Sequence, residues 1–187
     1  MTGRDEDALV AAFTGRAGAL GVRVERVADD GATVPEIQLE AQLAGTSRLV
    51  VSAELRRRAP ALIAALADGL SIETATEPAS VRDAPLALTF AHAAFAETGS
   101  VLLAEPDLAD RSVGMLSRTL IVLVAIDTLR SGLDDVAGQL RALATQPGGG
   151  YATIMTGPSR TADIERVLTV GVQGPGRIIV LFVDGLS

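Results

Sequence analysis

Segments with helical periodicity alternate with short apolar runs along most of the chain. Residues 120–125 are apolar at every position, which is typical of a strand in a sheet that helices cover on both faces. Apolar residues at helical spacing predict helices over residues 7–20, 34–43, 60–67, 133–144 and 160–168. Runs of strand length predict further strands at 22–27, 49–52, 70–74, 87–96, 100–104, 151–156 and 177–183.

The order of these elements predicts the fold class. Strands that alternate with helices form an α/β fold with a mostly parallel central sheet, helices on both faces and, here, an N-terminal helix at about residues 5–20. A length of 187 residues without an internal repeat or a linker predicts one domain over residues 1–187.

Charge and aromatic content argue against nucleic acid as a partner. Sixteen basic residues against 23 acidic ones give a net charge of −7, whereas a nucleic-acid binder presents a basic face to phosphates. The chain has no Trp, one Tyr and four Phe, too few rings for a base-stacking platform.

Missing residue types narrow the chemistry further. The chain has no Lys and no Cys, which excludes a Schiff base, a P-loop lysine, a thiolate nucleophile and a cysteine-ligated zinc or iron–sulfur site. His92 is the only histidine, so one chain cannot build a multi-histidine metal site. We therefore expect no metal and no cofactor in this chain, and any chemistry falls to carboxylates, Arg, hydroxyls, Gln and backbone groups.

Apolar run length also bears on location. The longest runs, at 120–126 and 178–183, are far shorter than the roughly 20 residues of a membrane helix. Three acids near the N-terminus do not fit a secretory signal. These features predict a cytoplasmic protein without a transmembrane segment.

The segment 156–165 is the first candidate site, because it follows a predicted strand and ligands of open α/β sheets collect beyond strand carboxyl ends. Ser159 would cap the next helix, and its N–H groups together with Arg160 would favour a carboxylate or phosphate. Gly157, after Thr156, lets a ligand approach the backbone. The alternative is that Ser159 is only a cap and Arg160 pairs with Asp163.

Two more segments carry candidate residues. Glu97, in the turn with Thr98 and Gly99, has a carboxylate that can act as base, nucleophile or ligand, against the alternative of an ordinary polar turn. Gln173 lies in a Gly- and Pro-rich run that either reaches a ligand or simply enters the last strand. His92 lies in an apolar stretch, where a packed or hydrogen-bonded histidine is more common than a catalytic one.

These three segments together resemble the lactate-utilization protein C family, which is built on the LUD domain. The order of elements is similar from about residue 7 to residue 184. The resemblance implies a fold of the sugar-phosphate isomerase and CoA-transferase-like class. It also implies association with two iron–sulfur proteins in the oxidation of L-lactate to pyruvate. The family pattern usually reads His-Gly-Pro where this chain has Gln173, and an amide does not titrate in the useful range, so binding is the role expected there.

Three hypotheses follow for function. The first is an accessory subunit of a lactate-oxidising iron–sulfur complex, with the clusters in its partners. It would hold a small carboxylate or phosphate-bearing ligand near Glu97, Thr98, Gly99, Thr156, Gly157, Ser159, Arg160, Asp163 and Gln173. The second is a stand-alone CoA-transferase-like or isomerase-like enzyme that uses Glu97. The third is a ligand sensor without turnover.

Overall fold

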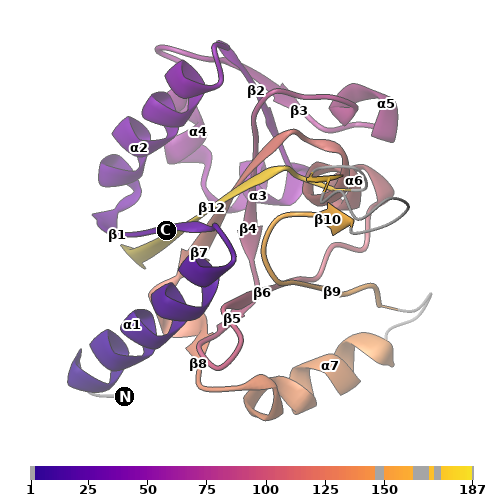
Figure 1. Ribbon diagram of the computed structural model, residues 1–187. Helices are drawn as coiled ribbons and strands as arrows, with labels where there is room; N and C mark the ends of the chain where they lie inside the picture. Colours follow the sequence, from indigo (N-terminus) through magenta and orange to yellow (C-terminus); the bar gives the residue numbers. More distant parts are fainter. Residues whose placement is uncertain (1–2, 146–149, 162–168, 171–173, 187) are drawn as a thin grey trace.

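A six-stranded parallel sheet forms the centre of the protein (Figure 1). The computed structural model describes residues 3–145, 150–161, 169–170 and 174–186. The strands lie in the order β1 (Arg23–Asp29), β12 (Arg177–Gly185), β7 (Thr119–Ala125), β4 (Ala87–Ala91), β2 (Arg48–Val51) and β3 (Ser71–Thr74). This confirms the predicted α/β class with its mostly parallel central sheet.

Alternate side chains of the central strands enter two separate cores. In β7, Leu120, Val122 and Val124 belong to one core, while Ile121 and Leu123 belong to the other. β12 alternates in the same way. Burial of each such side chain stabilises the fold by about 1.5–3 kcal/mol, which explains why these strands are apolar at successive positions.

Helices cover both faces of the sheet. One face packs against α2 (Asp30–Leu43), α3 (Ala53–Arg58) and α4 (Pro60–Leu66). The other face packs against α1 (Gly3–Ala19), α5 (Pro78–Val81) and α6 (Leu108–Leu116). The rings of Phe13 in α1 and Phe182 in β12 meet edge to face at 5.0 Å. The predicted N-terminal helix is therefore confirmed and is part of the core.

A second, smaller sheet lies beside the α1 face. Its strands follow the order β8 (Leu129–Arg130), β5 (Ala93–Phe95), β6 (Ser100–Leu103) and β9 (Thr153–Met155), with antiparallel β5–β6 and β6–β9 pairs. One side of this sheet joins the core under α1, and the other is covered by η2 (Leu133–Val136) and α7 (Ala137–Ala144). The remaining described elements are short: η1 (Ile126–Thr128), β10 (Arg160–Thr161) and β11 (Thr169–Val170).

The expected strand 87–96 proves to be two strands. β4 pairs with β2 and β7 in the central sheet, whereas β5 pairs with β6 and β8 in the smaller sheet. His92 lies between them, and its backbone N–H donates to the carbonyl of Leu102. The sequence of this mostly apolar run does not show where the chain passes from one sheet to the other.

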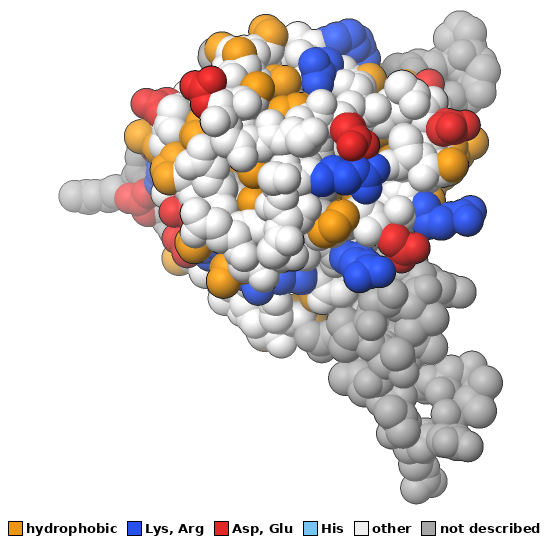
Figure 2. All heavy atoms as spheres, turned by 90° about the horizontal axis from the view of Figure 1, so that it is seen from above, with side chains coloured by type: hydrophobic (Ala, Val, Ile, Leu, Met, Phe, Trp, Pro, Cys, Tyr) orange, Lys and Arg blue, Asp and Glu red, His pale blue; other side chains and the backbone are white. Residues whose placement is uncertain are grey.

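Opposite charges are mixed on the outside of the protein. Figure 2 shows Arg side chains beside acidic ones on the face seen from above, with no continuous basic stripe among the described residues of that face. The carboxylate of Glu40 in α2 is almost fully buried and accepts from Arg23 of β1 and Arg177 of β12, at 2.7 and 3.0 Å. This pair of contacts fastens α2 to the starts of two strands.

None of the helices in the described part of the chain combines the length and apolar character needed to cross a membrane.

Candidate functional site

The structure brings parts of the three sequence motifs together. Ser100 donates a hydrogen bond to Thr98 Oγ1 at 2.8 Å, and its own Oγ lies 2.6 Å from Thr156 Oγ1. Further along, the N–H of Ser159 donates to the carbonyl of Pro175 at 2.9 Å. The hydroxyl contact thus joins the first and second motifs, which are more than 50 residues apart, and the backbone contact joins the second motif to the third. We call Thr98, Ser100 and Thr156 the hydroxyl cluster.

Two of the predicted site glycines allow close contact with α1 and with Leu20 directly after it. Gly99 has a φ of 67°, and a Cβ there would lie 2.5 Å from the backbone N of Ala17. Gly157 has a φ of 75°, and a Cβ there would lie 3.1 Å from Cβ of Leu20. A positive φ favours glycine on its own, and the close approach of the helix adds a second reason. Both glycines therefore have a packing role.

The expected helix 160–168 is wrong at its start. Arg160 and Thr161 form β10, which pairs antiparallel with β11. Ser159 therefore does not cap a helix, and the argument for an anion held by helix N–H groups at this position fails. The preceding strand, β9, belongs to the smaller sheet, so the rule for parallel-sheet edges does not apply to it either. Asp163 and Gln173 lie outside the described residues.

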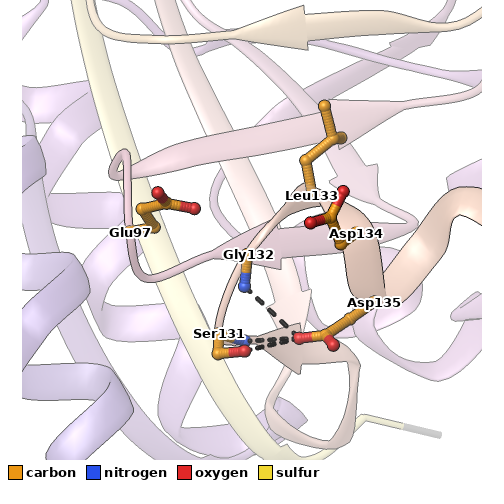
Figure 3. A pocket seen from close by; sticks show the side chains of 6 residues that line it. All are labelled: Glu97, Ser131, Gly132, Leu133, Asp134 and Asp135. Atoms are coloured by element: carbon orange, nitrogen blue, oxygen red, sulfur yellow. Dashed lines mark hydrogen bonds between the residues drawn. The ribbon is translucent and has the colours of Figure 1, made fainter.

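Glu97 lies in a pocket of its own. This open pocket of about 510 Å³ is lined by Glu97, Ser131, Gly132, Leu133, Asp134 and Asp135 (Figure 3). A Cβ on Gly132 would lie 2.7 Å from Oε2 of Glu97, which places this carboxylate directly over the Gly132 backbone. Sequence reasoning did not connect the 131–135 segment with Glu97, because their proximity depends on the β5–β8 pairing.

This pocket is lined by negatively charged side chains. The Ser131 hydroxyl donates to Asp135 at 2.6 Å, and this bond, with that from the Gly132 N–H, holds the pKa of Asp135 below its usual value. Glu97 and Asp134 add two further carboxylates. Among the residues that the structure describes, no group of three or more acidic or His side chains is placed to hold a metal ion. The pocket thus offers an exposed carboxylate at Glu97 that can accept a hydroxyl, and the negative end of a ligand would lie outside the pocket.

Two further pockets adjoin each other where the parallel strands end. His92 follows β4, Asp127 and Thr128 follow β7, and Leu186 follows β12. They line a pocket of about 380 Å³ with Arg58, Phe90, Ala91 and Ala125. His92 also lines an adjoining pocket of about 420 Å³, together with Glu54, Arg57, Ala104, Pro106, Asp107 and Asp110. We call the two pockets together the His92 cleft.

The polar side chains of the His92 cleft contact one another. Arg58 donates to Glu54 Oε1 at 3.1 and 3.0 Å, and its guanidinium lies 4.2 Å from the centre of the Phe90 ring. His92 Nδ1 accepts from the Ala104 N–H at 3.1 Å, and Nε2 lies 3.6 Å from Glu54 Oε1. The His92 ring, followed by Arg58, lowers the pKa of Glu54 against the opposing effect of partial burial.

A buried carboxylate lies behind this cleft. Glu105 is 4% exposed and accepts from Thr89 Oγ1 at 2.8 Å. Burial raises the pKa of Glu105 to about 7, and the Thr89 hydrogen bond only partly opposes this.

Sequence reasoning missed the His92 cleft. Its residues come from five separate segments, and the one available signal was the position of the single histidine directly after a buried strand. His92 is indeed hydrogen-bonded and half-buried, but it also lines both pockets.

Comparisons with known proteins give the family. Residues 61–183 match the model of the LUD domain. Lactate utilization protein C of Macrococcus caseolyticus is 35% identical over 103 residues, which are 54% of this chain and 45% of that protein. Lactate utilization protein C of Shouchella clausii is 32% identical over 120 residues, or 63% of this chain and 51% of that protein. The chain thus spans about half the length of these relatives.

A solved structure shares the fold. A DUF162 family protein from Deinococcus radiodurans superimposes with a TM-score of 0.66 at 22% sequence identity, covering 96% of this chain and 98% of that one. Because the family model covers about two thirds of the sequence, the resemblance expected from the three motifs is confirmed: the chain belongs to the LUD-domain family.

Proposed function

We infer that this chain acts in lactate utilization as a cytoplasmic accessory subunit of an iron–sulfur complex that oxidises L-lactate to pyruvate. The observation that carries this proposal is the similarity to several proteins named lactate utilization protein C, together with the matching LUD domain. The chain has no Cys, so the clusters would be held by two partner subunits.

The proposed role includes binding of a small carboxylate or phosphate-bearing ligand. The meeting of Thr98, Ser100 and Thr156 supports a site at the hydroxyl cluster, because these hydroxyls come from separate motifs. Arg160 would hold the anion, Ser159 would complete its hydrogen bonds, and Glu97 would accept a ligand hydroxyl. Asp163 and Gln173 stay in this proposed set with Gly99 and Gly157.

The complex is tested by affinity purification of the tagged full chain from its host grown on L-lactate. We expect cysteine-rich iron–sulfur subunits to copurify and a deletion strain to grow poorly on L-lactate. Recovery of the chain alone under gentle conditions, with normal growth of the deletion strain, would contradict the accessory-subunit role.

The ligand site is tested by Arg160→Ala in the same strain. We expect loss of growth on L-lactate with an unchanged melting temperature, because the guanidinium would serve binding. Arg56→Ala, an exposed arginine on α3, is the matched control and should grow normally. A large loss of thermal stability in Arg160→Ala would indicate a structural role instead.

A stand-alone enzyme is the second candidate, favoured by the exposed Glu97 carboxylate in its own pocket. A nucleophilic Glu97 would attack an acyl-CoA and expel the CoA thiolate to give a mixed anhydride, and attack of this thiolate on the Glu97 carbonyl would then give a Glu97–CoA thioester and release the free acid. Mass spectrometry of the intact native protein and of the intact Glu97→Gln variant tests this, because an adduct on Glu97 is present in the first and absent in the second. If no adduct forms with a broad panel of acyl-CoA compounds, the stand-alone enzyme is contradicted and the accessory-subunit role remains.

A further inference from the structure

The His92 cleft has the position of a ligand site in an α/β fold. Most of its lining comes from the ends of β2, β4, β7 and β12 and the segments that follow them, at the carboxyl ends of parallel strands, and residues 104–110, which follow β6 of the smaller sheet, close one side. Open parallel sheets bind their ligands beyond this edge. The two pockets that share His92, of about 380 and 420 Å³, have ample room for a small organic acid.

The hydrogen bond from the Ala104 N–H determines which ring nitrogen of neutral His92 carries the proton. Nδ1 accepts the Ala104 N–H, so the neutral ring must carry its proton on Nε2. Nε2 lies 3.6 Å from Glu54 Oε1, which is longer than a good hydrogen bond. His92 therefore offers an N–H donor at the place where the two pockets join.

Arg58 supplies a fixed positive charge next to this donor. Its hydrogen bonds to Glu54 and its stacking on Phe90 hold the side chain in place. A guanidinium has five N–H donors, and the bonds to Glu54 use Nε and one terminal nitrogen. The side chain is 54% exposed, so its remaining donors can reach a carboxylate in the cleft.

The acids of the cleft limit what this ligand can be. Both oxygens of Asp110 accept backbone N–H groups, those of Ala53 and Glu54, and Asp107 accepts the N–H of Ala109. Asp127 lines the same pocket as Arg58 and would repel a plain anion. A ligand with a hydroxyl close to its carboxylate satisfies both groups, because the hydroxyl can donate to Asp127.

We propose that the His92 cleft binds a small hydroxycarboxylic acid. Arg58 and the Nε2–H of His92 hold the carboxylate, and Asp127 accepts the hydroxyl proton in a hydrogen bond. Phe90 and Ala125 form the apolar part of the site. The class of ligand follows from the lining residues, whereas L-lactate as its member rests on the function proposed above.

The single histidine allows a direct test. In the ¹³C,¹⁵N-labelled full chain, the imidazole resonances belong to His92 without assignment work. Sodium L-lactate is titrated at constant pH and ionic strength, with pyruvate and acetate as probes that lack the hydroxyl. We expect a saturable shift of the His92 signals with L-lactate, and about tenfold weaker binding of pyruvate, because its keto group has no proton to donate to the Asp127 carboxylate.

Variants on one helix complete the test. Arg58→Gln should weaken L-lactate binding about tenfold, whereas Arg56→Gln, which makes the same change outside the cleft, should leave it unchanged. Arg58→Lys keeps the charge and is used if Arg58→Gln proves unstable. Absence of a saturable shift, or equal binding by the Arg56 and Arg58 variants, overturns the site.

The proposed binding site and the proposed function can be contradicted independently of each other. If L-lactate does not bind but the deletion strain grows poorly on L-lactate, the site is wrong and the proposed function stands. If L-lactate binds in an Arg58-dependent way but neither growth nor copurification supports the complex, the site stands and the proposed function fails.

Discussion

Glu105 is a carboxylate in an environment that favours its neutral form. It is buried, faces the Thr89 hydroxyl and lies near the negative charges of Asp110 and Glu54. Burial raises its pKa from 4.5 to about 7, so the folded state holds this proton more tightly than the unfolded state. Between these two values the folded protein binds more protons, and stability must fall as pH rises.

This predicts a pH dependence of stability that Glu105→Gln removes. For the native chain, the free energy of unfolding should fall by up to about 3 kcal/mol between pH 4.5 and pH 7 from this group, and the variant should lack this part of the slope. Urea unfolding of both proteins across this range measures the difference.

Glu73→Gln is the control, because Arg48 lowers the pKa of Glu73 and that carboxylate is ionised throughout most of the range in both states. Parallel stability curves for the native chain and Glu105→Gln would contradict the assignment.

At the residue scale, the contacts of the candidate sites could be predicted only where the two residues are close in sequence. The Thr98–Ser100 contact is local, and the turn that holds Glu97 was expected. The contact of Glu97 with Gly132 and the contact of His92 with Glu54 depend on strand pairing and on packing across the cleft. Such long-range proximity leaves no mark in a single sequence.

At the scale of elements, α1 is held by close backbone approach. Gly99 lets the turn between β5 and β6 come within van der Waals distance of Ala17, and Gly157 does the same for the segment after β9 at Leu20. The end of α1, with Leu20 directly after it, therefore contacts two of the three segments that carry the sequence motifs.

Gly99→Ala should destabilise the protein by about 2–4 kcal/mol, because a Cβ would meet the Ala17 N at 2.5 Å and a φ of 67° is strained for alanine. Gly18→Ala, on α1 itself, has nothing within 4 Å and should stabilise by about 0.5–1 kcal/mol through helix propensity. Chemical denaturation of both variants measures the two effects. Equal stabilities would show that the turn can move away from α1 at little cost.

Periodicity predicted the long elements and failed at the short ones. The helices over 7–20, 34–43 and 60–67 and the strand 120–125 correspond to α1, α2, α4 and β7. β10 is two residues long and pairs only with β11, so its sequence shows no strand pattern. In the same way α3 and α5 are too short for an apolar face to repeat.

At the scale of the whole molecule, the two cores share their central strands. β7 and β12 contribute alternate side chains to both cores, so neither core can form without the other. The single domain expected over residues 1–187 predicts one cooperative unfolding transition.

Urea unfolding followed by far-UV circular dichroism and by the His92 imidazole signal should therefore give the same midpoint. The first probe reports all helices and strands, and the second reports the junction between the two sheets. Val122→Ala and Leu123→Ala, which point into different cores, should each shift both probes together by about 1–4 kcal/mol. Two separate midpoints would mean that the smaller sheet unfolds independently.

The position of β2 in the sheet has a practical consequence for fragments of this chain. The matched family segment begins at residue 61, yet β2 lies between β4 and β3, and β1 pairs with β12. Cutting the gene at that boundary would remove an interior strand and an edge strand and expose the Phe182 side of the sheet to water. A homology boundary is thus a poor guide for cloning here, and the shortest fragment worth expressing must begin before α1.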